Sequence, residues 1–309
     1  MFDAHRVLID AFVDTARRSY RELYPGLPAE LDAGLERAAR TALTTLRQCD
    51  CPYHDLEHTL LVTDAGMTIL RGRQLARGDV PPASWLQAVV ALLFHDLGYL
   101  RGLLRDDRNG AYLADDSGRR VTPPADATDA YLTPYHVSRG SMFVLERFAC
   151  DPVIDGATVA SYIEMTRFPV PDEPFYQSLD SLGALVRAAD LIGQMGDPNY
   201  PMKQARLYTE LKETGEADRL GYQSPAALRA DFPRFFYGQV YPYLTVALDY
   251  LHRTQEGEHW IANLIRHLHG DRMEPHAVPV LRALPATLEE LIEVAPAPSG
   301  SGPMAVGSR

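Results

Sequence analysis

The sequence predicts an all-α protein that folds as a single helical bundle. In most segments apolar residues recur every three to four positions, which is the period of an amphipathic helix. The alternating pattern of a half-buried strand is scarce, and no internal repeat is present. Since 46% of the 309 residues are hydrophobic, the chain can bury a substantial core. We expect one helical domain over residues 1–294 and a flexible tail, rich in Pro, Gly, Ser and Ala, over 295–309.

Composition limits the possible partners of this chain. The formal net charge of −11 disfavours binding to a nucleic-acid polymer, which requires basic patches. A small anionic substrate remains compatible with it, because a bound metal supplies local positive charge. No apolar run approaches the roughly 20 residues that span a bilayer, and the N-terminus lacks the pattern of a signal peptide. With only three cysteines, we expect a cytoplasmic protein with reduced thiols and no membrane partner.

Four helices are expected in the first hundred residues, at about 7–23, 29–46, 56–70 and 84–98. Pro28 suits the start of the second helix, since proline is favoured in the first turn. Asp55 is a good N-cap for the third, because its carboxylate can accept a free backbone N–H. The fourth is apolar on most faces and therefore belongs at the centre of the bundle.

A long polar segment, residues 101–134, follows and is rich in turn-forming residues. Its arginines are interleaved with aspartates, which favours a solvated loop over a basic binding surface. A loop of this length is often functional, for instance as an active-site lid, and a disordered insertion is the alternative. Helices then resume at about 134–148, 156–166, 179–195, 202–214, 225–232, 238–253, 258–269 and 288–292.

The residues that carry chemistry begin with His54 and His58, four positions apart, and the adjacent pair His95-Asp96 at the end of an apolar run. Imidazole nitrogens and carboxylate oxygens are common ligands of divalent metals. Burying Asp96 beside an apolar segment costs about several kcal/mol unless something compensates its charge. A metal ion would compensate it, so these residues indicate a metalloenzyme.

Asp190 poses the same problem in a later helix. It lies in the largely apolar run Leu185–Ile192, where an aspartate needs a partner. The partner is either a metal shared with the earlier histidines or Arg187, one helical turn away. Helical bundles build central metal sites from ligands that project inward from several helices.

Taken in order, these motifs resemble those of the HD-domain metal-dependent phosphohydrolases, most closely the cyclic-nucleotide phosphodiesterase branch. They are Tyr-His-x-x-x-His, Leu-x-x-His-Asp-x-Gly, a histidine that opens a helix, and Ala-Asp-Leu, together spanning about residues 51–197. The resemblance implies an HD-type bundle with one or two divalent cations, for which manganese, iron, zinc, nickel and magnesium are all suited. By the same resemblance the metal ligands are His58, His95, Asp96 and Asp190.

The resemblance also assigns roles around the metal. His54 matches the histidine that protonates the leaving oxygen, and Asp96 matches the carboxylate that bridges two metals. His136 matches a histidine near the second metal. Tyr99 stands where the phosphodiesterases carry a further histidine.

A second departure concerns the residue that reads the purine in the phosphodiesterases. Aligning Phe235 and Pro242 with the family's Phe and Pro puts Phe232 in place of the family's glutamine. A cyclic-purine substrate is therefore not expected, although a flat aromatic or sugar group could stack on a pocket that includes Phe232, Phe235 and Tyr53.

Other polar residues have weaker assignments. Glu57 or Glu164 could orient a histidine, and Glu164 is also a candidate near the second metal or the substrate. Arg139 could bind substrate phosphate, but an ion pair with Glu146 on the same helix is favoured. Two further pairs are not expected to bind metal: Cys49 and Cys51, which lack partners, and His267 and His269, interpreted as surface residues.

The expected activity is hydrolysis of a small phosphoester, such as a nucleotide or a related metabolite. Metal coordination lowers the pKa of water from about 15.7 to about 7, which provides hydroxide at neutral pH, and His54 would donate a proton. Two alternatives stay open: a di-iron oxygenase of the same fold, and a non-catalytic metal-binding sensor or scaffold.

Overall fold

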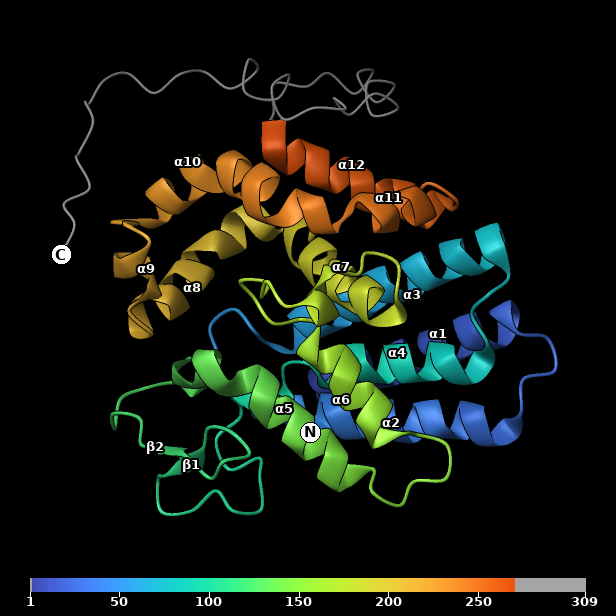
Figure 1. Ribbon diagram of the computed structural model, residues 1–309, viewed down its shortest axis with the longest axis horizontal. Coiled ribbons are helices and arrows are strands. Elements are labelled where there is room, and N and C mark those ends of the chain that lie inside the picture. The colour runs from blue at the N-terminus through green and yellow to red at the C-terminus, as the bar shows by residue number, and fades with distance from the viewer. Residues whose placement is uncertain (1, 270–309) are drawn as a thin grey trace. The chain divides into compact units, whose positions relative to one another are not determined.

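The computed structural model describes residues 2–269, which form twelve α-helices and one two-stranded hairpin (Figure 1). The all-α prediction is confirmed for this part of the chain. No helix within it is both long and apolar enough to cross a membrane. The helix expected at 288–292 and the tail expected at 295–309 lie outside the described residues.

The α-helices are α1 Ala4–Leu23, α2 Ala29–Leu46, α3 Leu56–Arg77, α4 Pro82–Phe94, α5 His136–Arg147, α6 Gly156–Glu164, α7 Leu182–Met195, α8 Tyr200–Glu213, α9 Glu216–Arg219, α10 Pro225–Phe235, α11 Thr245–Leu251 and α12 Gln255–His269. Shorter turns are η1 Leu97–Tyr99, η2 Asp129–Tyr135, η3 Pro174–Gln177, a π-helical turn Phe236–Val240 and η5 Tyr241–Tyr243. The hairpin pairs β1 Tyr112–Leu113 with β2 Arg120–Val121 in antiparallel register.

Helices α3, α4 and α7 pack against one another at the centre (Figure 1). Every residue of α4 from Trp85 to Phe94 is buried, as expected for a helix that is apolar on most faces. Gly193 lets α7 approach α3 closely, because a Cβ there would lie 2.5 Å from the Cα of Val62. This crossing places the side chains of α3 and α7 within reach of each other.

The fourth helix is shorter than predicted. It ends at Phe94 rather than near residue 98, and the chain tightens into the η1 turn after Asp96. A Cβ on Gly98 would overlap the carbonyl oxygen of His136, so glycine is required where η1 meets the start of α5. The His95-Asp96 pair therefore sits at a bend rather than on a straight helix.

The polar segment 101–134 is folded, so the reading as a disordered insertion is wrong. It contains the β1–β2 hairpin and is fastened by Arg139 of α5, whose side chain is fully buried. Arg139 binds Asp107 at 2.9 Å and the carbonyl oxygens of Gly98 and Leu100 at 2.7 Å each. The predicted partner of Arg139, Glu146, instead binds Arg105 at 2.7 Å.

Arg139 thus forms a buried ion pair, as favoured from the sequence, but its partner is Asp107 rather than Glu146. Because its guanidinium is taken up by Asp107 and by carbonyl oxygens, the substrate-phosphate role considered for Arg139 is not supported. Two arginines of the 101–134 segment pair with its own acids, as the interleaved acids led us to expect: Arg108 binds Asp106 at 2.5 Å, and Arg119 binds Asp115 at 2.8 Å.

A proline explains the largest difference between the predicted and the observed helices late in the chain. A continuous helix was predicted over 238–253, but α11 begins only at Thr245. Pro242 has no N–H to donate and lies in the η5 turn, so the chain passes through π and 3-10 turns before α11. The short helix α9 was not predicted at all.

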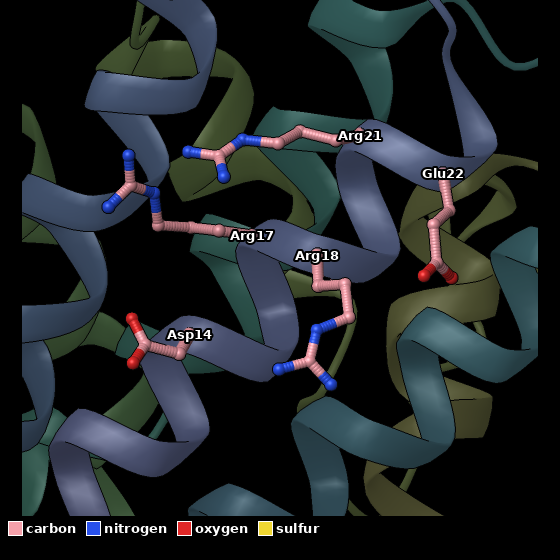
Figure 2. A pocket seen from close by; sticks show the side chains of 5 residues that line it. All are labelled: Asp14, Arg17, Arg18, Arg21 and Glu22. Atoms are coloured by element: carbon pink, nitrogen blue, oxygen red, sulfur yellow. The ribbon is translucent and has the colours of Figure 1, made fainter.

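An open hollow on α1 is lined by charged side chains (Figure 2). Two of them, Arg17 and Arg21, each reach Asp32 of α2 at 2.6 Å. These charges therefore tie α1 to α2 and are not free for a ligand.

Candidate metal centre

Four side chains from α3, the α4–η1 bend and α7 meet in the interior. His58 Nε2 lies 3.3 Å from Asp96 Oδ2 and 3.7 Å from Asp190 Oδ1. His95 Nε2 lies 3.2 Å from Asp96 Oδ2 and 3.4 Å from Asp190 Oδ1. The structure thus brings together the four residues that sequence reasoning singled out, and Asp190 does not pair with Arg187.

The four His–Asp separations are close to those expected around a single divalent cation. Two ligand atoms held about 2.1 Å from one metal are about 3.0–3.4 Å apart, depending on the geometry, which is close to the separations found here. His58 Nε2, His95 Nε2 and Asp96 Oδ2 are buried without a hydrogen-bond partner, although polar atoms in protein interiors are nearly always satisfied. Unsatisfied nitrogens and oxygens that point at one position are what a metal site presents.

Local structure aims these atoms at the cluster. His95 Nδ1 lies 2.7 Å from the carbonyl oxygen of Leu92, which can only accept, so Nδ1 carries the proton and Nε2 presents its lone pair. Asp55 caps α3, as predicted, by accepting the N–H of His58 at 3.0 Å. That cap fixes the first turn of α3, on which His58 lies.

The cluster is electrostatically tuned to hold positive charge. Burial would lower the pKa of His58, but the carboxylates of Asp190 and Asp96 outweigh it and raise this pKa to about 9. Burial would likewise raise the pKa of Asp96, yet His95 and His58 hold it well below its usual range. Both aspartates therefore stay ionised and favour a proton or a cation between themselves and the histidines.

His54 lies beside the cluster and is oriented by a residue that sequence reasoning missed. Its Nδ1 is 2.6 Å from Oε2 of Glu210, a buried residue of α8. The other oxygen of Glu210 accepts the backbone N–H groups of Tyr53 at 2.6 Å and His54 at 3.1 Å. The two acids predicted to orient a histidine have other partners. Glu57 pairs with Lys203 at 3.0 Å, and Glu164 pairs with Arg167.

Tyr99 lies flat between two histidines. Its ring centroid is 4.7 Å from that of His54 and 4.4 Å from that of His136, with interplanar angles of 20° and 13°. His136 Nδ1 is 2.6 Å from the carbonyl oxygen of Thr133. Burial lowers the pKa of His136, and the nearby carboxylate of Asp96 offsets this only in part. His136 is thus close to the cluster but does not contribute a donor atom to it.

The remaining candidates are divided between the site and the core. Tyr53 is buried with its ring 5.4 Å from that of His58, so it belongs to the site wall. Phe232 is buried, and α10 packs it against Tyr200 of α8. Phe235 is half-buried, and its ring centroid lies 5.8 Å from that of Phe168.

Glu164 is occupied by neighbouring side chains. Arg167 binds it at 2.5 Å, and the hydroxyl of Tyr176 donates to it at 2.6 Å. The prediction that His267 is a surface residue is wrong, because it is half-buried with Nδ1 2.7 Å from the carbonyl oxygen of Met195; His269 is exposed.

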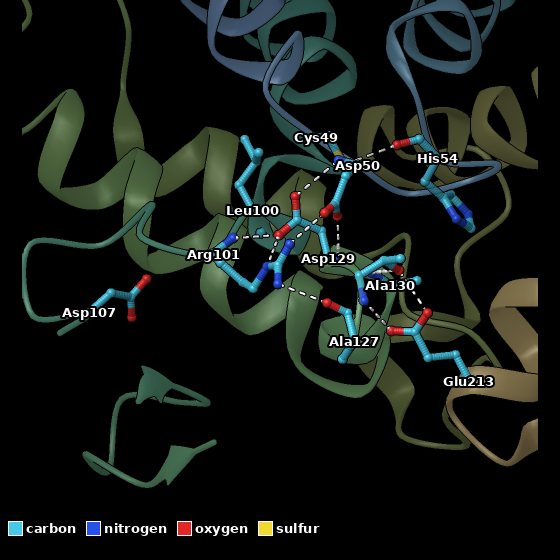
Figure 3. Close-up of polar contacts among 12 residues, drawn as sticks. Cys49, Asp50, His54, Leu100, Arg101, Asp107, Ala127, Asp129, Ala130 and Glu213 are labelled. Atoms are coloured by element: carbon cyan, nitrogen blue, oxygen red, sulfur yellow. Dashed lines mark hydrogen bonds and ion pairs between the residues drawn. The ribbon is translucent and has the colours of Figure 1, made fainter. Parts of the chain in front are cut away.

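The segment before α3 is held in place by a polar network (Figure 3). Arg101 binds both Asp129 at 2.7 Å and Asp50 at 2.5 Å, and Asp50 accepts the N–H of Asp129 at 2.6 Å. The thiol of Cys49 forms no disulfide and donates a weak hydrogen bond to the carbonyl oxygen of His54 at 3.5 Å. These contacts join the 101–134 segment to the loop that carries His54.

Within residues 2–269, two groups of three donors could hold a metal ion: His54, His58 and Asp96, and His58, His95 and Asp190. Both groups include His58 of the cluster, and the first also includes His54, which lies beside it. The chain therefore has one candidate metal centre in its described part, with a buried histidine–glutamate pair beside it.

Comparison with known proteins places the chain in a family but leaves its activity open. No curated protein matches the sequence, and no solved structure matches it. The model of the Npun_R2479-like family matches residues 2–272, which is most of the 309-residue chain. The protein therefore belongs to the Npun_R2479-like family.

Proposed function

We propose that this protein is a metal-dependent phosphohydrolase that cleaves a small phosphoester, such as a nucleotide or a related metabolite. The observation that carries the proposal is the convergence of four donor atoms, three of them buried and without a hydrogen-bond partner, beside the His54–Glu210 pair. Phosphoester cleavage needs charge neutralisation and a proton for the leaving oxygen, and this arrangement suits both needs. The order of the motifs, which resembles that of HD-domain phosphohydrolases, supports the same reaction.

The ligands of the cation would be His58, His95, Asp96 and Asp190. This mixture of imidazole and carboxylate donors suits manganese, iron, zinc, nickel or magnesium. When bound, the cation supplies positive charge to the phosphoryl oxygens and lowers the pKa of a coordinated water.

His54 would hold and deliver the proton. Glu210 fixes the ring through Nδ1, which leaves Nε2 as the nitrogen that can face a leaving oxygen. Burial would lower the pKa of His54, but the charge of Glu210 and its hydrogen bond raise it. Glu210 therefore favours the protonated imidazole, the form that a general acid requires.

The alternatives have less support. A di-iron oxygenase needs a second iron with its own ligands, and both donor groups in the described residues include His58. A metal-binding sensor or scaffold would need no proton donor, whereas the site holds His54 in a defined orientation with a buried acid.

The test combines metal analysis with a substrate screen. Purified protein should contain a divalent metal and release phosphate or a monoester from a panel of phosphomonoesters and phosphodiesters. Since loss of even a supporting residue at a metal site costs about 10- to 100-fold, Asp96→Ala should lower turnover by at least about 100-fold. Asp116→Ala, at an exposed position in the polar segment, should behave as the wild type.

Two results would contradict the proposal in different ways. Full turnover in Asp96→Ala would remove the site from the reaction. Tight metal binding without cleavage of any phosphoester would favour the sensor or scaffold instead.

A further inference from the structure

We infer that the centre holds one divalent cation per chain, and that the ring of Tyr99 is what keeps a second cation out. The inference rests on the proposed metal centre and narrows it from one or two cations to one. It follows from two observations: both donor groups share His58, and the ring of Tyr99 is stacked between the two neighbouring histidines.

The two donor groups cannot be filled at the same time. Both include His58, whose Nε2 lies 3.3 Å from Asp96 and 3.7 Å from Asp190. A neutral imidazole has one nitrogen with a free lone pair, so this nitrogen can bind only one cation. Whichever group is occupied, the other loses its third ligand.

The imidazoles nearest the cluster offer one nitrogen each. His54 has its Nδ1 committed to Glu210 at 2.6 Å, and His136 has its Nδ1 committed to the carbonyl oxygen of Thr133 at 2.6 Å, so only Nε2 of each ring could bind a cation. Glu164 is bound by Arg167 and Tyr176. Within residues 2–269, neither group of three donors is independent of His58.

The ring of Tyr99 occupies the space between His54 and His136, where these two histidines could otherwise bind a cation together. Its ring lies between His54 and His136 at centroid distances of 4.7 and 4.4 Å and nearly parallel to both. Rings stacked this closely are in van der Waals contact, which leaves no room for a cation and its ligands between their faces. Tyr99 itself is buried, and Cys51 and Ala130 pack with it, so the ring has little freedom to move aside.

The experiment counts metal and does not depend on turnover. The full chain is stripped with a chelator, equilibrated with excess Mn²⁺, desalted and analysed for manganese per polypeptide. Wild type and Tyr99→Phe, which keeps the ring, should each retain one equivalent. Tyr99→His replaces the ring with a smaller one that offers a nitrogen ligand, and its count should rise toward two. Circular dichroism melting checks that each variant is folded.

The outcomes separate this inference from the proposal beneath it. Two equivalents in the wild type or in Tyr99→Phe would overturn the single-cation centre while leaving the metal site in place. A folded Tyr99→His variant that stays at one equivalent would overturn the role of Tyr99. Should Tyr99→His not fold, the wild-type and Tyr99→Phe counts still decide the stoichiometry. A count near zero in the wild type would overturn this inference together with the metal centre.

Discussion

At the scale of single residues, the pairing of His54 with Glu210 is the most informative contact outside the metal ligands. One carboxylate binds the ring of His54 and the backbone N–H groups of two successive residues. Burial would raise the pKa of Glu210, but the nearby His54 outweighs this and lowers it. Glu210 therefore stays ionised and can stabilise a protonated His54.

This contact predicts the behaviour of Glu210→Gln. The amide keeps the shape of the side chain but removes its charge, so His54 should be a poorer proton donor. Because supporting residues at metal sites typically contribute about 10- to 100-fold, turnover should fall by that factor while bound metal stays at the wild-type level. Steady-state kinetics and metal analysis check both parts.

Glu213→Gln provides the matched control for that variant. Glu213 lies one turn further along α8 and binds Thr128 rather than a histidine. Its loss should leave turnover near that of the wild type. If Glu210→Gln turned over substrate as fast as this control, His54 would not depend on Glu210 for its role.

The sequence pointed to the four cluster residues but not to Glu210, and the reason is physical. His95, Asp96 and Asp190 interrupt or end apolar segments, where a charged residue demands a partner. Glu210 lies in the polar run Thr209–Thr214, which is typical of a solvated helix face. Its burial comes from packing against the loop of Tyr53 and His54, which is distant in the sequence, and no local pattern records such a contact.

At the scale of secondary-structure elements, local signals fixed some boundaries and missed others. The range predicted for α2 matches the structure, and Asp55 caps α3 as its residue type suggests. The end of α4 was misplaced, because the bend at His95-Asp96 depends on the contact of Gly98 with α5. Periodicity within one helix cannot reveal where another helix will press against it.

Packing of α3 on α7 predicts the effect of Gly193→Ala. Alanine in a helix interior is ordinarily favoured over glycine by up to about 1 kcal/mol. Here the added Cβ would meet Val62 Cα at 2.5 Å, and such overpacking typically costs about 1–3 kcal/mol. The variant should lose unfolding free energy and also bind metal more weakly, because α7 carries Asp190 and would be pushed away from His58.

Gly238→Ala is the control for this substitution. No heavy atom lies within 4 Å of a Cβ built at Gly238, so its stability and metal affinity should stay near those of the wild type. Chemical denaturation of the metal-free proteins and metal titration give the two quantities. Equal stability of the two variants would show that α3 and α7 can separate without cost.

At the scale of the whole molecule, the candidate centre links segments that are far apart in the chain. Its donors come from the first turn of α3, the end of α4 and the middle of α7, and the pair beside it comes from the loop before α3 and from α8. An unfolded chain cannot hold these groups together. A cation bound there would therefore favour the folded state alone, and the formal net charge of −11 favours its approach.

This linkage predicts that metal raises the thermal stability of the whole domain. At a free metal concentration of 100 times Kd the folded state gains about 2.7 kcal/mol, and EDTA should remove the gain. For a domain of this size, each kcal/mol shifts Tm by about 2–4 °C, so a rise of roughly 5–10 °C is expected on adding Mn²⁺. Calorimetry of the wild type and of Asp190→Ala separates specific from diffuse binding, because the variant keeps almost all of the acidic surface but loses one of the four donors. A shift of the same size in Asp190→Ala would mean that the metal acts elsewhere on the acidic surface and that the cluster does not hold it.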